Sequence, residues 1–425
     1  MKIRVVAALV MGALAAQTQA AGFQLAETSA TGLGRAFAGE AAIADNASAQ
    51  GRNPALLMEL HGQQISAGMV YVDPNIDLKG DVNVALGPID LPMGDASADD
   101  IAPAAFIPNF FYSNRLSDKL AIGFAVNANH GMATELPADH AAAIFGSDTA
   151  ITTVEFAPAV AYQINEQFAV GATLRVIYGD GKVTGTVPAW VPTLVPSLPA
   201  GEKLKAVEGD GIDFGYQLGA TWEPSQATRI GVNYRSEVDL TLEGEAEGIA
   251  YGLQPGEKKD GELVLPLPAT AELAAVHQLT DKFAVHGSVN WTDWSAFETL
   301  TVDFAEGPSL LKEENFEDSW RYAVGATYQA NDKVTLRAGV ALDEGGVSDE
   351  NRTLSIPDSD RLWFSFGSGY QLSENLSLDL AFTYIKADSA TINESVAIAD
   401  GVNANFSGEL SGDVWLAGTQ LSYRF

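Results

Sequence analysis

The 425-residue sequence contains no cysteine, so no disulfide bond can hold the folded chain together. Basic residues are also scarce: 24 Lys and Arg stand against 55 Asp and Glu, which gives a formal charge of -31. Such a chain would repel the phosphates of nucleic acid, which argues against nucleic acid as a partner. After the first twenty residues no run of about 18 apolar residues occurs, and no membrane-spanning helix is therefore expected. Yet 47% of the residues are hydrophobic, so the apolar residues must be arranged in another way.

The first twenty residues have the features of an export signal. Lys2 and Arg4 give a positive start, and residues 5–16 form an apolar run that is followed by small residues suited to cleavage. An N-terminal membrane anchor is the alternative, but the run is too short to span a bilayer. The sequence therefore predicts a signal peptide over residues 1–20 and a mature chain that begins at Ala21.

The rest of the chain alternates apolar and polar residues from about residue 63, which is the period of a β-strand. A short phrase also recurs: an aromatic residue or His, then several polar turn residues, then a new alternating run. The six copies begin at Tyr112, Tyr162, Trp222, His277, Tyr328 and Tyr370. Each copy predicts a tight hairpin whose ring lies at a membrane interface.

The number of strands follows from the number and spacing of these turns. Consecutive phrases lie about 40 to 60 residues apart, enough for two strands of about ten residues and one longer loop. Six short turns, together with the first and last strands, give fourteen strands and seven long loops. An open sheet edge would find no hydrogen-bonding partner in lipid, so the sheet must close. We therefore predict an all-β membrane protein, a 14-stranded antiparallel outer-membrane β-barrel.

A soluble secreted β-sandwich or propeller is the alternative to the barrel. The long strands and the aromatic residues beside the turns disfavour it. The final strand "QLSYRF" ends at Phe425, and a terminal aromatic residue is typical of strands handled by the barrel assembly machinery. We therefore expect that machinery, outer-membrane lipid and lipopolysaccharide among the partners.

Several stretches of the sequence closely resemble the FadL family, the bacterial outer-membrane transporters of long-chain fatty acids. They occur in the order expected of the family and cover the mature chain from end to end. Among them are "AGFQL" at Ala21, "GLGRAFAGEAAIAD" at Gly32, "RNPAL" at Arg52, "HGMATEL" at His130, "NFEDSWRYAVGATY" at Asn315 and "NRTLSIPDSDRLWFS" at Asn351.

The resemblance implies that residues 21–61 fold inside the barrel as a hatch, and that residues 62–425 form the barrel itself. The composition fits this interpretation, because the segment is rich in Gly and Ala and a partly filled lumen leaves room only for small residues. A disordered periplasmic tail is the alternative. In the family the motif Asn53, Pro54 and Ala55 belongs to the hatch and matters for transport.

A fatty acid requires an apolar tube and at least one cation or hydrogen-bond donor for its carboxylate. Two loop regions are too apolar for ordinary solvated loops, and an exposed apolar patch usually marks a binding surface. The resemblance implies that they form an outer groove that captures the ligand. The groove residues we predict are Phe145, Val187, Trp190, Val191, Leu194 and Val195. The alternative is that these side chains pack only on one another and cap the barrel.

The resemblance also implies an inner pocket that contains Phe23 and Lys312. Lys312 matches the family's cation for the ligand carboxylate, although a loop lysine paired with Glu313 or Glu314 is an alternative. A second family cation falls near Gly185, where this chain carries no charge, and Lys182 lies three residues away. This departure leaves the head-group geometry open and keeps a less charged ligand as an alternative.

Gly131 lies in a strand that is kinked in the family, where a hole opens in the barrel wall. The function implied is passive uptake: capture in the loop groove, transfer to the inner pocket, movement of the hatch around Phe23, and lateral exit into the membrane. Import of aromatic or other hydrophobic hydrocarbons is the alternative, and a porin or an outer-membrane enzyme is a weaker one. The five His residues show no metal-binding spacing and no nucleophile motif is present, so we predict neither a cofactor nor catalysis.

Overall fold

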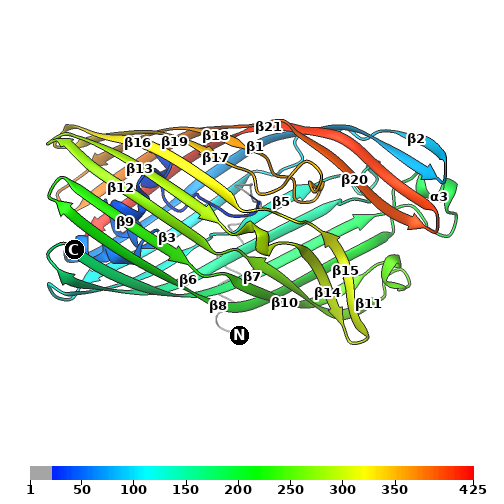
Figure 1. Cartoon of the computed structure of the whole chain (residues 1–425), viewed down its shortest axis with the longest axis horizontal. Coiled ribbons are helices and arrows are strands. Elements are labelled where there is room, and N and C mark those ends of the chain that lie inside the picture. Colours follow the sequence, from blue (N-terminus) through cyan, green and yellow to red (C-terminus); the bar gives the residue numbers. More distant parts are fainter. Residues whose placement is uncertain (1–21) are drawn as a thin grey trace.

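A computed structural model describes residues 22–425, so the predicted signal peptide, residues 1–20, lies outside the described residues. The chain forms one antiparallel sheet of 21 strand segments that closes on itself (Figure 1). Seven of the wall strands consist of two consecutive segments, so that the closed sheet has fourteen strands. The predicted 14-stranded barrel is confirmed.

The strands follow one another around the barrel in chain order. Their bounds are β1 (Gln63–Leu86), β2 and β3 (Ile89–Asp95, Ala105–Arg115), β4 and β5 (Leu120–Asn127, Gly131–Glu135), β6 (Asp148–Asn165), β7 (Phe168–Thr186), β8 (Lys203–Ser225), β9 and β10 (Thr228–Arg235, Val238–Glu247), β11 and β12 (Lys258–Leu267, Thr270–Thr280), β13 and β14 (Phe283–Thr292, Thr299–Phe304), β15 and β16 (Gly307–Glu313, Ser319–Asn331), β17 (Val334–Asp343), β18 (Arg361–Gln371), β19 and β20 (Leu376–Ala387, Ala390–Ala399) and β21 (Val402–Arg424). The first and last strands form the closing seam, which runs from Gln64 opposite Arg424 to Leu86 opposite Val402.

All six predicted hairpins are present, and they lie with the C-terminus at one end of the barrel (Figure 1). The long connections lie at the other end, where β2, β11, β14, β15 and β20 extend the wall. Aromatic side chains near the short turns point outward and are exposed on the wall, as an interfacial belt requires. They are Tyr162, Phe168, Trp222, Tyr328, Tyr370, Tyr423 and Phe425.

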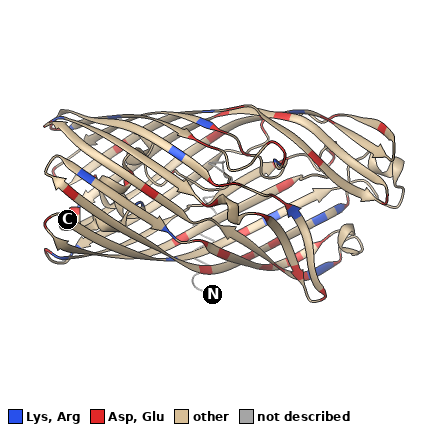
Figure 2. Ribbon diagram, in the orientation of Figure 1, with Lys and Arg blue, Asp and Glu red and all other residues tan. Residues whose placement is uncertain are grey.

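The middle of the wall alternates between an apolar outer face and a more polar inner face. Phe214 and Leu218 of β8 are exposed on the outside, whereas Gln217 between them is buried. The alternation reflects the two-residue period of a strand, which turns successive side chains to opposite faces. Charged residues are frequent on the long-loop extensions of the wall (Figure 2). Some of them form surface ion pairs, such as Lys258 with Glu245 at 2.7 Å.

Residues 22–60, which we call the inner segment, lie inside the barrel and are almost entirely buried (Figure 1). The segment consists of short helical turns: α2 (Ala30–Leu33), η1 (Glu40–Ala42), η2 (Ala47–Gly51) and η3 (Pro54–Glu59). Side chains cap three of them, because Ser29, Asn46 and Asn53 each accept a hydrogen bond of 3.0 Å from a backbone N–H in the following turn. Local capping thus stabilises turns too short to be stable helices.

The barrel wall carries glycines where the inner segment touches it. A Cβ atom at Gly171 would lie 2.5 Å from the backbone N of Ala55, and one at Gly339 would lie 2.1 Å from the carbonyl O of Arg35. Wall and segment therefore pack backbone against backbone, which only a residue without a side chain permits. We call these residues the wall glycines: Gly123, Gly171, Gly219, Gly231, Gly325, Gly339, Gly367 and Gly418.

Two further short helices lie in the long connections, α3 (Val191–Leu194) and η4 (Ile249–Tyr251). A third, η5 (Trp294–Ala296), lies between the two segments β13 and β14 of one wall strand. Within residues 22–425, no helix has both the length and the apolar character needed to cross a membrane.

Candidate functional site

Phe23 lies at the centre of a buried aromatic cluster inside the barrel. Its ring is fully buried and contacts Trp294 and Phe297 edge-on, with ring centroids 4.8 and 5.2 Å away. Phe316 adds a fourth ring, and inward-facing residues of β10 and β11, with Val207 of β8 and Leu300 of β14, surround the rings. We call this group the Phe23 cluster. Apart from the Trp294 indole N–H it offers mainly apolar contacts, which suits a hydrocarbon ligand.

The two apolar loop regions form a second cluster, which we call the loop cluster. Phe145, Val187 and Val191 are at most 5% exposed, and the Phe145 ring packs on Phe406 of β21 at 6.1 Å. These three side chains are therefore buried, rather than forming the exposed patch that we expected from the sequence. The reason is that the two loops cover each other: the Trp190 indole N–H donates to the carbonyl of Ala141 at 3.0 Å.

The remaining predicted groove residues lie at the margin of the loop cluster. Trp190 and Val195 are half-buried and pack against it, and Leu194 of α3 is also half-buried. A ligand that entered here would have to separate apolar side chains that now contact one another. Such a step exchanges one apolar contact for another, so its cost in free energy is small.

Lys312 lies between the two clusters. On β15 it is the cross-strand neighbour of Leu300, which belongs to the Phe23 cluster. Its ammonium donates to the carbonyl of Phe145 in the loop cluster at 3.3 Å and also to the Ser355 hydroxyl. Its ion pair is with Glu394 of β20 at 2.9 Å, and not with Glu313 or Glu314 as the alternative supposed.

Glu314 lies in the same region and is fully buried. One of its carboxylate oxygens accepts a hydrogen bond from the Thr353 hydroxyl at 3.1 Å. Burial raises the pKa of Glu314 to about 7, and the positive charge of Lys312 opposes this rise. The site therefore contains a carboxyl that changes charge near neutral pH.

The space beside Gly185, where the second family cation would fall, is narrow. A Cβ atom there would lie 3.0 Å from the carbonyl O of Ile144 in the loop cluster, so a side chain would fit only if this backbone moved slightly. Lys182, the nearby candidate, forms an ion pair with Asp148 at 2.6 Å. The residue directly opposite Gly185 on β8 is Lys205, which the sequence alone did not identify.

The wall is interrupted beside Phe23. Strand β4 ends at Asn127 and β5 begins at Gly131, so Gly131 starts a strand segment instead of lying within one. Among the described residues β5 pairs only with β6, and Ala105–Asn109 of β3 pair only with β1. The backbone of the inner segment partly covers this interruption: Gly131 N–H donates to Phe23 O at 2.7 Å and Leu25 N–H donates to Asn129 O at 2.8 Å.

At the far end of the inner segment, the Asn53 side chain joins the segment to the wall. It donates to Ala41 O at 2.7 Å within the segment and to Ala220 O of β8 at 3.1 Å. Pro54 and Ala55 follow and lie against the wall glycines Gly171 and Gly219. The three hatch residues named from the sequence therefore contact the barrel wall directly.

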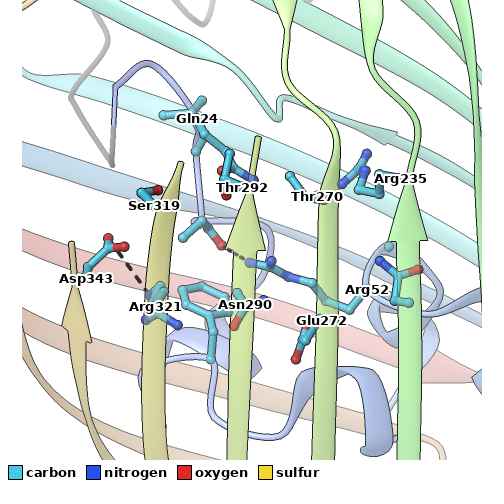
Figure 3. Close-up of a pocket in the computed structure, with 15 residues that line it drawn as sticks. Gln24, Arg52, Arg235, Thr270, Glu272, Asn290, Thr292, Ser319, Arg321 and Asp343 are labelled. Atoms are coloured by element: carbon cyan, nitrogen blue, oxygen red, sulfur yellow. Dashed lines mark hydrogen bonds and ion pairs between the residues drawn. The ribbon is translucent and has the colours of Figure 1, made fainter. Parts of the chain in front are cut away.

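Beyond Phe23, toward the short-turn end, the lumen is polar. Gln24, Leu25 and Ala26 border a cavity of about 60 Å³, lined also by the charged residues Arg52, Arg235, Glu272, Arg321 and Asp343 (Figure 3). Next to it Glu155 forms ion pairs with Arg175 at 3.0 Å and with Arg235 at 2.8 Å. Sequence reasoning missed this network, although charges at inward positions of alternating strands were a signal for it. The described residues include no group of three or more His, Asp or Glu that could hold a metal ion.

Comparison with known proteins extends over nearly the whole chain. The family profile described as outer membrane protein transport protein (OMPP1/FadL/TodX) matches residues 11–425. The 47 kDa outer membrane protein of Pasteurella multocida is 36% identical over 98% of this chain and 96% of its own length. The long-chain fatty acid transport protein of Escherichia coli O6:H1 is 33% identical over 98% of this chain and 97% of its own length.

Solved structures give the same picture of the fold. The crystal structure of a Pseudomonas aeruginosa FadL homologue superimposes with a TM-score of 0.84 and 25% identity, over 95% of this chain and all of that one. The Pseudomonas putida toluene transporter TodX gives a TM-score of 0.67 at 18% identity, over 96% of this chain and all of that one. At that level of identity the second likeness shows the shared fold alone.

Proposed function

Because the chain belongs to the OMPP1/FadL/TodX family of outer membrane transport proteins, we propose that it carries long-chain fatty acids passively across the outer membrane. The observation that carries the proposal is the position of Lys312, whose ammonium lies between the Phe23 cluster and the loop cluster. A cation bordered by two apolar regions matches a molecule with one carboxylate and a long hydrocarbon tail.

In the proposed route, the ligand first parts the loop cluster around Phe145, Val187 and Val191. Its tail then enters the Phe23 cluster while its carboxylate meets the cationic site. Movement of the inner segment around Phe23 breaks the backbone hydrogen bonds from Gly131 to Phe23 and from Leu25 to Asn129, which uncovers the interruption in the wall. Lateral exit into the membrane lowers the free energy of a hydrophobe, so this step requires no energy source.

The inner segment acts as the hatch in this proposal. The part around Phe23 moves, whereas Asn53, Pro54 and Ala55 hold the far end against the wall. The polar cavity supports a sideways route, because an acyl chain continuing along the axis would displace paired charges without replacing their interactions.

Import of a neutral aromatic hydrocarbon is the second candidate. The observation that favours it is the ion pair between Lys312 and Glu394, which already neutralises the predicted anchor. The toluene transporter TodX shares the fold and is named for such a ligand. A ligand without charge would leave this ion pair intact.

Binding to the detergent-purified protein tests the proposal. We expect oleate to bind the wild type, and Lys312→Ala to weaken binding by about tenfold or more, because a hydrogen bond to a charged group is lost. Lys258→Ala is the matched control, since Lys258 forms an exposed ion pair away from the site. Toluene that competes fully with oleate, together with unchanged oleate binding by Lys312→Ala, would favour the second candidate.

A further inference from the structure

The ammonium of Lys312 already has an acceptor for each of its three N–H groups. These acceptors are the carbonyl of Phe145, the hydroxyl of Ser355 and the carboxylate of Glu394. Glu394 is itself held in place, because its second oxygen accepts the backbone N–H of Leu354 at 2.8 Å. A ligand carboxylate could therefore reach Lys312 only by displacing one of these groups.

Lys205 is the second ammonium at this site. It lies on β8 directly opposite Gly185, and residues opposite each other in an antiparallel pair point to the same face. Two residues farther along, on the same face of β8, Val207 belongs to the Phe23 cluster. The Lys205 ammonium contacts the carbonyl of Leu310 at 3.4 Å, only two residues before Lys312.

Among residues 22–425, Lys205 forms no ion pair, although acidic residues outnumber basic ones more than twofold in this chain. The outermost exposed aromatic residue of β8 is Phe214, which we take to mark the membrane interface on this strand. Lys205 lies nine residues farther toward the long loops, and therefore outside the membrane-spanning part of the strand. Burial lowers the pKa of Lys205, and the charge of Lys312 lowers this pKa further. An unpaired, half-buried cation close to a second cation is unfavourable by itself, and an anion bound beside it would relieve the repulsion.

We propose that Lys205 is the residue that first binds the carboxylate of the ligand, and that Lys312 joins it when Glu394 is displaced. The ligand class assigned to the site is thus a long-chain anionic amphiphile and not a neutral hydrocarbon. This inference rests on the proposed function and adds the head-group specificity to it. It also supplies, from the neighbouring strand, a charge that is absent at Gly185.

The test compares oleate with methyl oleate, which has the same tail and no charge, on the purified full-length barrel. Lys205→Gln is expected to weaken oleate binding on the order of tenfold, because a bond to a charged group is lost, and to leave methyl oleate binding unchanged. Lys203→Gln is the matched control: it lies two residues earlier on β8 and pairs with Glu247 at 2.7 Å. Lys205→Arg should restore most of the oleate affinity, because it restores the charge.

Three results would overturn the inference. Wild-type oleate affinity in Lys205→Gln would show that the cation is not used. An equal loss of oleate and methyl oleate, with a changed electrophoretic heat shift, would show a structural role. An equal loss in Lys203→Gln would show a general charge effect. In all three cases the proposed function stands, whereas failure of both ligands to bind the wild type would refute the proposed function as well.

Discussion

The lumen contains two buried regions of opposite character, and Phe23 lies at the border between them. Toward the long loops, the Phe23 and loop clusters consist of apolar side chains with a few cations and acids at their edge. Toward the short turns, ion pairs lie within the inner segment, such as Arg35 with Glu40 at 2.6 Å and with Asp45 at 2.5 Å, and Asp45 also faces Arg337 of β17 at 3.9 Å. Most side chains of both regions are buried, so burial alone does not tell them apart.

The two regions differ in the free energy that is needed to open them. Apolar side chains that part around a hydrocarbon exchange one apolar contact for another. Removal of one partner from a buried ion pair costs about 3–5 kcal/mol, because a buried charge is left uncompensated. The first region can therefore admit a ligand that the second region would exclude, and the interruption between Asn127 and Gly131 lies at their border.

We expect the largest effect, a loss of stability, from a substitution that removes one partner of a buried ion pair in the polar region. Arg35→Met leaves the buried Glu40 without its ion-pair partner and Asp45 with only Arg337 at 3.9 Å, and it should lower the free energy of unfolding by about 3–5 kcal/mol. Urea titrations of the barrel in lipid vesicles would measure the change. Lys258→Met, which breaks an exposed ion pair, should cost no more than about 1 kcal/mol. Similar costs for the two variants would contradict the distinction between the regions.

A smaller effect is expected at the fixed end of the inner segment. Pro54→Ala removes a φ constraint at the start of η3 and should loosen the segment by about 0.4–1 kcal/mol. We expect uptake of labelled fatty acid by cells to fall by about twofold to fivefold, the same energy expressed as a ratio. Pro255→Ala, in an exposed loop, is the control. The mutant barrel should assemble normally, and normal uptake would contradict a hatch that must be held at this end.

We expect the smallest effect, a change in ligand affinity, from the titration of Glu314, the buried carboxyl in the apolar region. The Glu314 carboxyl has a pKa of about 7, so it is mostly protonated at pH 6 and mostly ionised at pH 8. The ionised form repels an anionic ligand, and binding should therefore strengthen as the pH falls through 7. We expect about a twofold to threefold change, because the nearby charge of Lys312 offsets part of the repulsion.

An alkyl sulfonate is the suitable probe for this measurement, because it stays ionised over the whole pH range. Glu314→Gln carries no charge at either pH, and its binding curve should be flat between pH 6 and 8. The same pH dependence in wild type and mutant would assign the titration to another group.

The barrel could be predicted from the sequence because its signals are local. Each hairpin phrase lies within about a dozen residues, and counting six of them fixes fourteen strands. The small residues of the inner segment were equally visible. The wall glycines can be read in the sequence, but their contacts with the inner segment cannot be predicted from it. Gly171 and Ala55, for example, meet only after the sheet has closed around the segment.

The candidate site was less predictable because its contacts cross the barrel. Lys312 was identified, but its partner Glu394 comes from a different long connection, and the position of Lys205 depends on the register of β7 with β8. The sequence offered the burial of Phe145 and Val187 only as the alternative to an open groove, because two separate loops cover each other. Register and loop packing depend on the whole fold, which no local pattern specifies.

The closing seam also joins the two ends of the folded chain. Ser66 meets Ser422 at 2.9 Å across the seam, and Gly418 of the last strand lies against Ala30 and Leu33. The inner segment therefore packs against one of the last strands in the sequence, and α2 cannot complete its packing until β21 has paired with β1. A chain shortened before β21 would lose both the closed wall and part of the surface that supports α2.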